Sequence, residues 1–206
     1  DIACGGVDEN SREPDFYTTP PVVQQDVNQI DVSTRNEQSL ALTVKDLNRG
    51  ESRTAVRVRP SPLDLFNYKQ LKYFVHGSND MDAEILPGTS AKVFAYIRFG
   101  WDTLNYYEYR FPLTSGWMEH VIEFSEISAI KQLKGANVNL PYFVGAKNSG
   151  TQFGILGTPS LTRIQYIAYG IENNAYPGSL TSTMWVNELR VVQAEDTKAV
   201  SYTHLL

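Results

Sequence analysis

Three acidic residues at alternate positions are the residues best suited to binding a cation. Asp80, Asp82 and Glu84 lie in the polar stretch between Gly77 and Gly88. Calcium takes several oxygen ligands at once, and acidic loops of this kind often stabilise jelly-roll domains. The stretch lacks the glycine and the distal acidic ligand of an EF-hand loop. We therefore predict no metal site and interpret the stretch as a solvated acidic loop, with calcium binding as the alternative.

Catalytic motifs are absent from the sequence. Cys4 is the one cysteine, and neither His76 nor His120 has a second histidine or cysteine at ligand spacing. Both histidines lie at the ends of predicted strands, so we expect them at the surface or at a sheet rim. No Gly-x-Ser-x-Gly motif and no phosphate-binding loop occurs. The sequence predicts no enzyme and no cofactor. A carboxylate pair for glycoside hydrolysis depends on three-dimensional separation, and no particular pair stands out.

Aromatic residues gather around one predicted hairpin and suggest a binding surface. Trp101, Tyr106 and Tyr107 are the candidates, because exposed aromatic rings stack on sugar rings. Strand alternation, however, places Tyr107, Tyr109 and Phe111 together on one face, opposite Tyr106. That face is more simply explained as core or as a contact with a neighbouring domain.

Composition limits the class of protein. The 206 residues are 42% hydrophobic and 20% charged, which is ordinary for one globular domain. The net charge of −5 and the lack of a basic cluster argue against nucleic acid as a partner. Twelve of the residues are tyrosines, which favour strands.

Short segments of alternating hydrophobicity predict about nine or ten strands. The ranges are 36–44, 54–59, 71–75, 92–100, 105–112, 120–124, 140–144, 151–156, 163–170 and 183–192. We expect hairpins between the first two and between 92–100 and 105–112, and a central position for 71–75. Ser61-Pro62 opens a predicted short helix or turn, and Ser125 caps a predicted helix at 126–134, with Ile127, Ile130 and Leu133 on one face. The predicted fold is all-β, an antiparallel β-sandwich of jelly-roll type with two short helices.

The last predicted strand carries charges on an otherwise apolar face. Strict alternation places Trp185, Asn187, Leu189 and Val191 on one side and Met184, Val186, Glu188 and Arg190 on the other. We therefore expect Glu188 and Arg190 to pair with each other or to lie at a sheet rim.

Both ends of the chain depart from the strand pattern. Residues 1–35 are polar and proline-containing, and we predict an extended lead-in or linker. Residues 36–196 form the predicted sandwich domain. Residues 200–205 (VSYTHL) resemble a translated sequencing-adapter string. We therefore expect residues 197–206 to be a non-native tail on a fragment of a longer protein.

Five segments occur in a characteristic order: 36–40 (NEQSL), 64–76 (DLFNYKQLKYFVH), 95–100 (AYIRFG), 105–113 (NYYEYRFPL) and 185–190 (WVNELR). Together they resemble the SprA (Sov) family, the large outer-membrane translocon of type IX secretion and gliding motility in Bacteroidetes-like bacteria. The resemblance covers residues 36–192, and the first 35 residues do not share it.

The resemblance implies a non-catalytic segment of a giant export pore at the bacterial outer membrane. Such a segment would scaffold the pore or contact partners, without itself spanning the membrane. The implied partners are other parts of the same chain, secretion-system subunits and exported proteins. The matching positions are expected to be structural anchors: Asn36, Glu37, Gln38, Trp185, Asn187, Glu188 and Arg190. A carbohydrate-binding jelly-roll module is the alternative, and it requires Trp101 and Tyr106 to line an open groove.

Overall fold

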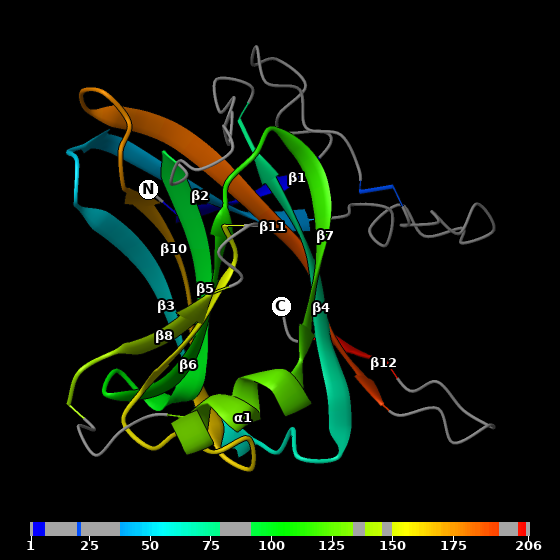
Figure 1. The fold of residues 1–206 in the computed structure, drawn as a ribbon. Helices are drawn as coiled ribbons and strands as arrows, with labels where there is room; N and C mark the ends of the chain where they lie inside the picture. The colour runs from blue at the N-terminus through cyan, green and yellow to red at the C-terminus, as the bar shows by residue number, and fades with distance from the viewer. Residues whose placement is uncertain are drawn as a thin grey trace, which may run out of the picture.

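The computed structural model describes residues 2–6, 20–21, 38–78, 92–133, 139–145, 150–193 and 202–204, and they form two antiparallel sheets that face each other (Figure 1). The first sheet, sheet A, has the strand order β1-β2-β11-β4-β7, with β12 also pairing with β11. The second, sheet B, has the order β3-β10-β5-β6-β9-β8. The strands of sheet A are β1 (Ile2–Gly6), β2 (Gln38–Leu47), β4 (Tyr68–Gly77), β7 (Gly116–Glu123), β11 (Leu180–Gln193) and β12 (Tyr202–His204). Those of sheet B are β3 (Ser52–Leu63), β5 (Val93–Asp102), β6 (Asn105–Pro112), β8 (Tyr142–Gly145), β9 (Gln152–Leu156) and β10 (Ile164–Asn173).

Eight of these strands form a jelly roll. β5 pairs with β6, β4 with β7, β3 with β10 and β2 with β11, so the first half of the chain pairs with the second in reverse order. The result is one long antiparallel ribbon that alternates between the two sheets. The predicted jelly-roll sandwich is confirmed.

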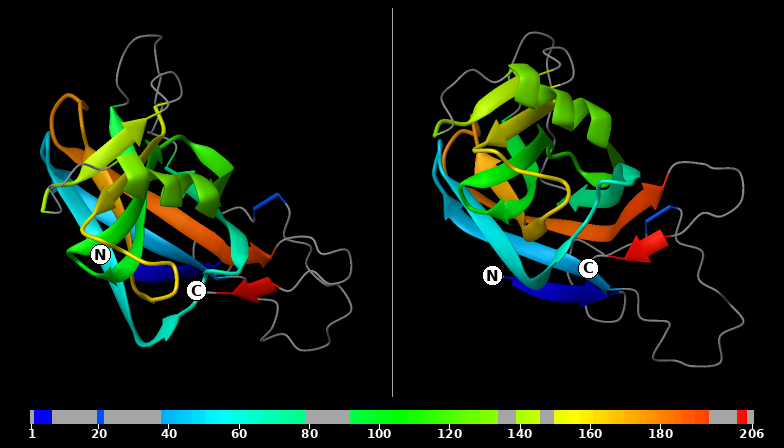
Figure 2. Two further views of the ribbon diagram at one scale, coloured as in Figure 1. Left: turned by 60° about the horizontal axis from the view of Figure 1, so that its bottom comes forward. Right: turned by 90° about the horizontal axis from the view of Figure 1, so that it is seen from below.

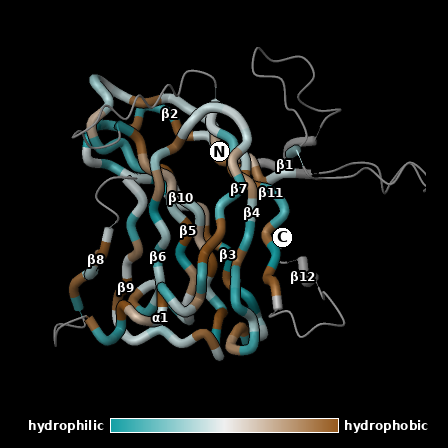
Figure 3. The backbone as a smooth tube through the Cα atoms, turned by 45° about the vertical axis from the view of Figure 1, so that its right-hand side comes forward, coloured by the Kyte–Doolittle hydropathy of each residue, from teal (hydrophilic) through white to brown (hydrophobic). Residues whose placement is uncertain are grey.

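Alternate side chains of both sheets fill the space between them. Ile97 and Phe99 of β5, Tyr107 of β6 and Ile122 of β7 are almost completely buried there. The regular change between hydrophobic and hydrophilic residues along the strands is visible in Figure 3. The hydrophobic residues therefore recur at every second position of a strand, and this period places them in the core.

Helix α1 (Phe124–Leu133) lies across one end of the sandwich (Figure 2). Phe124, Ile127 and Ile130 point into the core, as expected from their helical spacing. Leu133, predicted on the same face, is 59% exposed because the helix ends there.

The predicted hairpin between 36–44 and 54–59 is wrong. Strands β2 and β3 belong to different sheets, and the turn between them crosses from one sheet to the other. Gly50 donates its backbone N–H to the carbonyl oxygen of Asn173 at 2.6 Å, which ties this turn to the end of β10. Two strands with alternating hydrophobic residues and a short turn between them have the same sequence pattern in either case. The pattern does not distinguish strands that pair in one sheet from strands that lie in two facing sheets.

Of the short helix or turn predicted at Ser61-Pro62, the helix is wrong, and α1 is the one helix among the described residues. Strand β3 continues to Leu63, since the fixed φ of Pro60 and Pro62 suits an extended chain as well as a first helical turn. Asp64 then accepts a hydrogen bond from the N–H of Phe66 at 2.9 Å. Asp64 therefore stabilises a turn, not a helix N-terminus.

A bulge in β11 changes which residues face the core. Met184 and Val186 lie in the core before it, and Leu189 and Val191 after it. The register shifts between Asn187 and Arg190, and Glu188 has a φ of 54°. An extra residue of this kind moves the following side chains to the opposite face. The strict alternation predicted for this strand is therefore wrong beyond Asn187.

Candidate functional site

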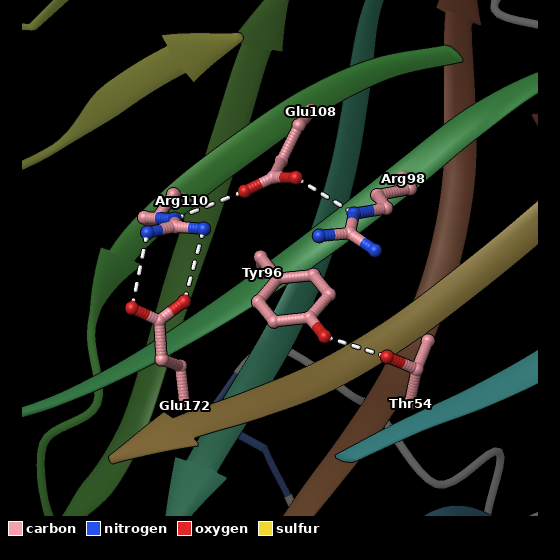
Figure 4. Close-up of polar contacts among 6 residues, drawn as sticks. All are labelled: Thr54, Tyr96, Arg98, Glu108, Arg110 and Glu172. Carbon is pink, nitrogen blue, oxygen red and sulfur yellow. Dashed lines mark hydrogen bonds and ion pairs between the residues drawn. The ribbon is translucent and has the colours of Figure 1, made fainter. Parts of the chain in front are cut away.

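The outer face of sheet B carries a group of charged and aromatic residues. Alternation directs Tyr96 and Arg98 of β5 outward, together with Glu108 and Arg110 of β6. Glu172 of β10 and Thr54 of β3 lie on the same face. We call these six residues the ion network, and Figure 4 shows them: Thr54, Tyr96, Arg98, Glu108, Arg110 and Glu172.

Two arginines hold one carboxylate at the centre of the ion network. Arg98 Nε lies 2.7 Å from Glu108 Oε2, and Arg110 Nε lies 2.9 Å from Glu108 Oε1. Arg110 also reaches Glu172, with an N–O distance of 3.0 Å. Arg98 lies directly opposite Glu108 in the register of β5 and β6. The sheet pairing therefore sets the geometry of the network.

Aromatic rings enclose the network. The Arg98 guanidinium lies 4.4 Å from the centroid of the Tyr96 ring and 4.9 Å from that of Tyr106. The hydroxyls of Tyr96 and Thr54 share a hydrogen bond of 2.6 Å. A Cβ at Gly170 would stand 2.1 Å from the Tyr96 ring, so only glycine leaves room for that ring. Tyr96 is consequently 1% exposed despite its position on an outer face.

The positive charge of Arg98 is held by its surroundings. Burial alone would lower the pKa of Arg98, but attraction to Glu108 and the hydrogen bond between them hold it above its ordinary value. Glu108 is fully buried and engages an arginine with each carboxylate oxygen. A general acid or nucleophile must present its carboxyl group to a substrate. Glu108 and Glu172 are instead committed to arginines, which suits a structural role.

His120 lies inside the sandwich, so its predicted surface position is wrong. Its ring centroid is 3.7 Å from that of Phe111, and its Nδ1 lies 3.5 Å from the Tyr109 hydroxyl. Burial lowers the pKa of His120 to about 4. The imidazole is therefore neutral at neutral pH.

The candidate sugar-binding residues do not share one exposed face. Tyr107 lies in the core, 1% exposed, and its hydroxyl donates to the carbonyl oxygen of Pro159. Tyr106 lies on the outer face against Tyr166 and is 6% exposed. Trp101, at the end of β5, is 36% exposed, with the Arg163 guanidinium 4.7 Å from its ring centroid. The structure thus separates Trp101 from the two tyrosines.

The expected anchors in β11 lie around the bulge. Trp185 packs against Ala41 and, edge to face, against His76, with 5.1 Å between ring centroids. Asn187 is buried and accepts the backbone N–H of Glu188 at 2.7 Å. Arg190 lies 3.7 Å from Glu188, the pairing expected from the sequence, and 2.7 Å from Glu119.

Several predicted positions fall outside what the structure describes. Asn36, Glu37 and the acidic residues Asp80, Asp82 and Glu84 belong to this group. Gln38 begins β2. Among the described residues, no group of three or more His, Cys, Asp or Glu side chains could hold a metal ion.

A surface hollow of about 340 Å³ lies beside the start of α1. Its lining mixes rings, hydroxyls and one pair of opposite charges: Phe66, Tyr68, Lys69, Glu123, Phe124, Ser125, Ser128 and Leu161. Glu123 accepts a hydrogen bond from Gln70, so its carboxylate is already engaged.

The ion network escaped the sequence analysis although its signal was present. Arg98, Glu108 and Arg110 interrupt strands that are otherwise apolar or aromatic. Opposite charges on one face of a predicted hairpin indicate a cross-strand pair. Glu172 gave no such signal, because its proximity to Arg110 depends on where β10 joins the sheet.

Comparison with known families decides the affiliation. The model of the SprA N-terminal family, described as a motility-related/secretion protein, matches residues 6–205. The chain belongs to this family. The match extends beyond the range 36–192 over which the five sequence segments lie. The SprA-family chain has no significant match among curated proteins.

A solved structure with limited similarity to this chain is entitled "Structural analysis of an exo-beta-agarase", with 12% identity and a TM-score of 0.48. The match covers 80% of this chain and 22% of that one. Agarase activity belongs to that protein and is not inferred for the SprA-family chain. No helix in the described part of the chain is long and apolar enough to span a membrane.

Proposed function

We propose that this chain is a non-catalytic β-sandwich segment of a giant outer-membrane translocon for protein export, of the type IX system that also serves gliding motility. The observation that carries the proposal is the SprA-family match over residues 6–205. The segment scaffolds the pore or contacts partners.

The chemistry of sheet B supports a role without catalysis. Glu108 and Glu172, the two carboxylates of the ion network, are both bound by Arg110. If these carboxylates contacted a substrate, their ion pairs with the arginines would break. Charged groups would then be buried without a partner, which is energetically unfavourable. The network is better suited to holding the outer face of sheet B rigid while other proteins contact the sandwich.

The proposed location is the envelope of Bacteroidetes-type bacteria, at the outer membrane. The proposed partners are other segments of the same long chain, subunits of the secretion system and exported proteins.

Affinity purification of the whole gene product tests this function. The tagged protein is purified from outer membranes, with and without residues 38–193. We expect it in the outer membrane in both cases, with secretion-system subunits recovered with the intact protein and depleted without the segment. Recovery from the cytosol, or an unchanged set of subunits, would contradict the proposal.

Carbohydrate binding is the competing function, and it rests on Trp101. Its ring is partly exposed, whereas Tyr106 is 6% exposed. Glycan-array binding that is lost in a Trp101→Ala variant and kept in an Arg163→Ala variant would favour this function over ours.

A further inference from the structure

Strand β3 forms one edge of sheet B. It pairs with β10 on one side, and no described strand pairs with its other side. In Figure 1 it lies at the left margin of the molecule, with no strand drawn beyond it. The backbone N–H and C=O groups along such an edge are a template for another strand.

The edge of β3 is long, and its prolines lie only near its end. Ser52–Val58 pairs regularly with β10, and Pro60 and Pro62, which block strand addition, come only after that stretch. Thr54, Val56 and Val58 favour extended backbone. The other described edge strands are shorter than the 12 residues of β3: β7 has 8, β1 has 5 and β8 has 4.

The two faces of β3 differ in chemistry. Val56 and Val58 are 50% and 71% exposed on the outer face. They pair with Ala168 and Tyr166, so they extend an apolar patch on that face towards the edge. A strand added beside β3 would bury both valines, which is favourable.

Arginines occupy the opposite face. Arg53, Arg57 and Arg59 are three positive charges on a strand with no acidic residue, in a chain of net charge −5. Arg53 has an exposed partner, Glu51, at 3.5 Å. The Arg59 Nε is buried without a hydrogen-bond partner among the described atoms. A neighbouring strand with carboxylates on this face would pair with these arginines.

We infer that β3 accepts, by strand addition, an extended segment of another protein in which acidic and apolar residues alternate. The apolar side chains cover Val56 and Val58, and the carboxylates meet Arg53, Arg57 and Arg59. Two copies of this chain do not fit, because six arginines would meet along one seam. The inference deepens the proposed partner contact but rests on the geometry of β3 itself.

Peptide binding to the 206-residue chain, followed by NMR and calorimetry, tests the inference. The probe is a nine-residue peptide with alternating valine and glutamate. One control peptide carries lysine for glutamate, and another is N-methylated at alternate residues. We expect shifts of the β3 amides, slower hydrogen exchange along Ser52–Val58 and affinity that falls with salt. Both control peptides should bind at least tenfold more weakly.

Two surface variants locate the site. Val58→Lys and Arg57→Glu should each weaken the peptide at least tenfold. Val121→Lys is the matched control, because Val121 is a partly exposed valine on β7, the edge of the other sheet. It should leave binding unchanged. Equal binding of the lysine peptide, shifts confined to other strands or dimerisation through β3 would overturn the inference.

The experiments distinguish an error in the inference about β3 from an error in the proposed function. Secretion subunits that co-purify with a gene product unable to bind the peptide would overturn only the edge inference. Peptide binding without co-purification would overturn only the export function. Binding by this chain but not by the whole gene product would assign the edge to a segment of the same protein, and would also overturn the inference.

Discussion

At the scale of single residues, Glu108 shows how a charge can be buried on the outer face of a sheet. It is fully buried, yet both of its oxygens contact arginines at 2.9 Å or less. Removing its charge leaves the Arg98 guanidinium without the carboxylate it pairs with, and leaves Arg110 with Glu172 alone. Glu108 is therefore expected to contribute far more to the stability of the fold than a surface carboxylate does.

Glu108→Gln tests this difference. We expect a loss of about 3 kcal/mol in the free energy of unfolding, because Arg98 loses the carboxylate it pairs with and Arg110 keeps only Glu172. Glu119→Gln is the matched control: Glu119 pairs with Arg190 but is 36% exposed, so less than about 1 kcal/mol should be lost. Urea denaturation measures both. Equal losses in the two variants would contradict the structural role of the network.

His120 makes stability depend on pH. Its pKa is about 4 in the folded chain, against 6.5 for the ordinary group, so the unfolded chain binds the proton first as pH falls. The contribution of neutral His120 to the free energy of unfolding is fully present above pH 6.5. It is lost as the pH falls from 6.5 to about 4. That shift corresponds to about 3 kcal/mol.

Denaturation curves at several pH values check this in the native chain and in His120→Phe and His120→Leu. The difference in stability between native chain and variant should change across this pH window and be flat above it. Parallel curves for the native chain and both variants would show that His120 does not titrate as described.

At the scale of elements, the bulge in β11 lets one strand serve two packing arrangements. Glu188 takes a left-handed φ of 54°, and the residues after it exchange faces. Without this residue, Leu189 and Val191 would face away from the core. The bulge also places Arg190 beside Glu119 of β7.

Substitutions at Glu188 should follow the backbone. Glycine accepts a positive φ readily and valine does not, so Glu188→Val should be less stable than Glu188→Gly by about 2 kcal/mol. The same two substitutions at Glu119, which also contacts Arg190 but lies in a regular strand, should give the reverse order. Thermal unfolding of the four variants provides the comparison. The same order at both sites would exclude strain at Glu188.

The elements also show what a single sequence can predict. The β5–β6 hairpin, the central strand β4 and helix α1 follow from local periodicity and capping. Pairing between distant strands does not, which is why β2 and β3 were predicted to pair and are in different sheets. The bulge at Glu188 carries no sequence signal of its own. In the ion network, alternation places Glu108 with Arg110, but only the register brings Glu172 to them.

At the scale of the whole molecule, the jelly roll places two kinds of surface on one rigid body. The ion network and its rings stiffen the middle of sheet B, while β3 leaves that sheet open at its edge. This division suits the contact role proposed for the segment. It also agrees with membership of a motility and secretion family.

Export by living cells tests the central claim most directly. A strain whose gene lacks residues 38–193 should keep the protein in its outer membrane, yet release little cargo into the medium. A Glu108→Asp strain should also release less cargo, but only to the extent that the substitution lowers the stability of the sandwich. Undiminished cargo release from the deletion strain would contradict the account.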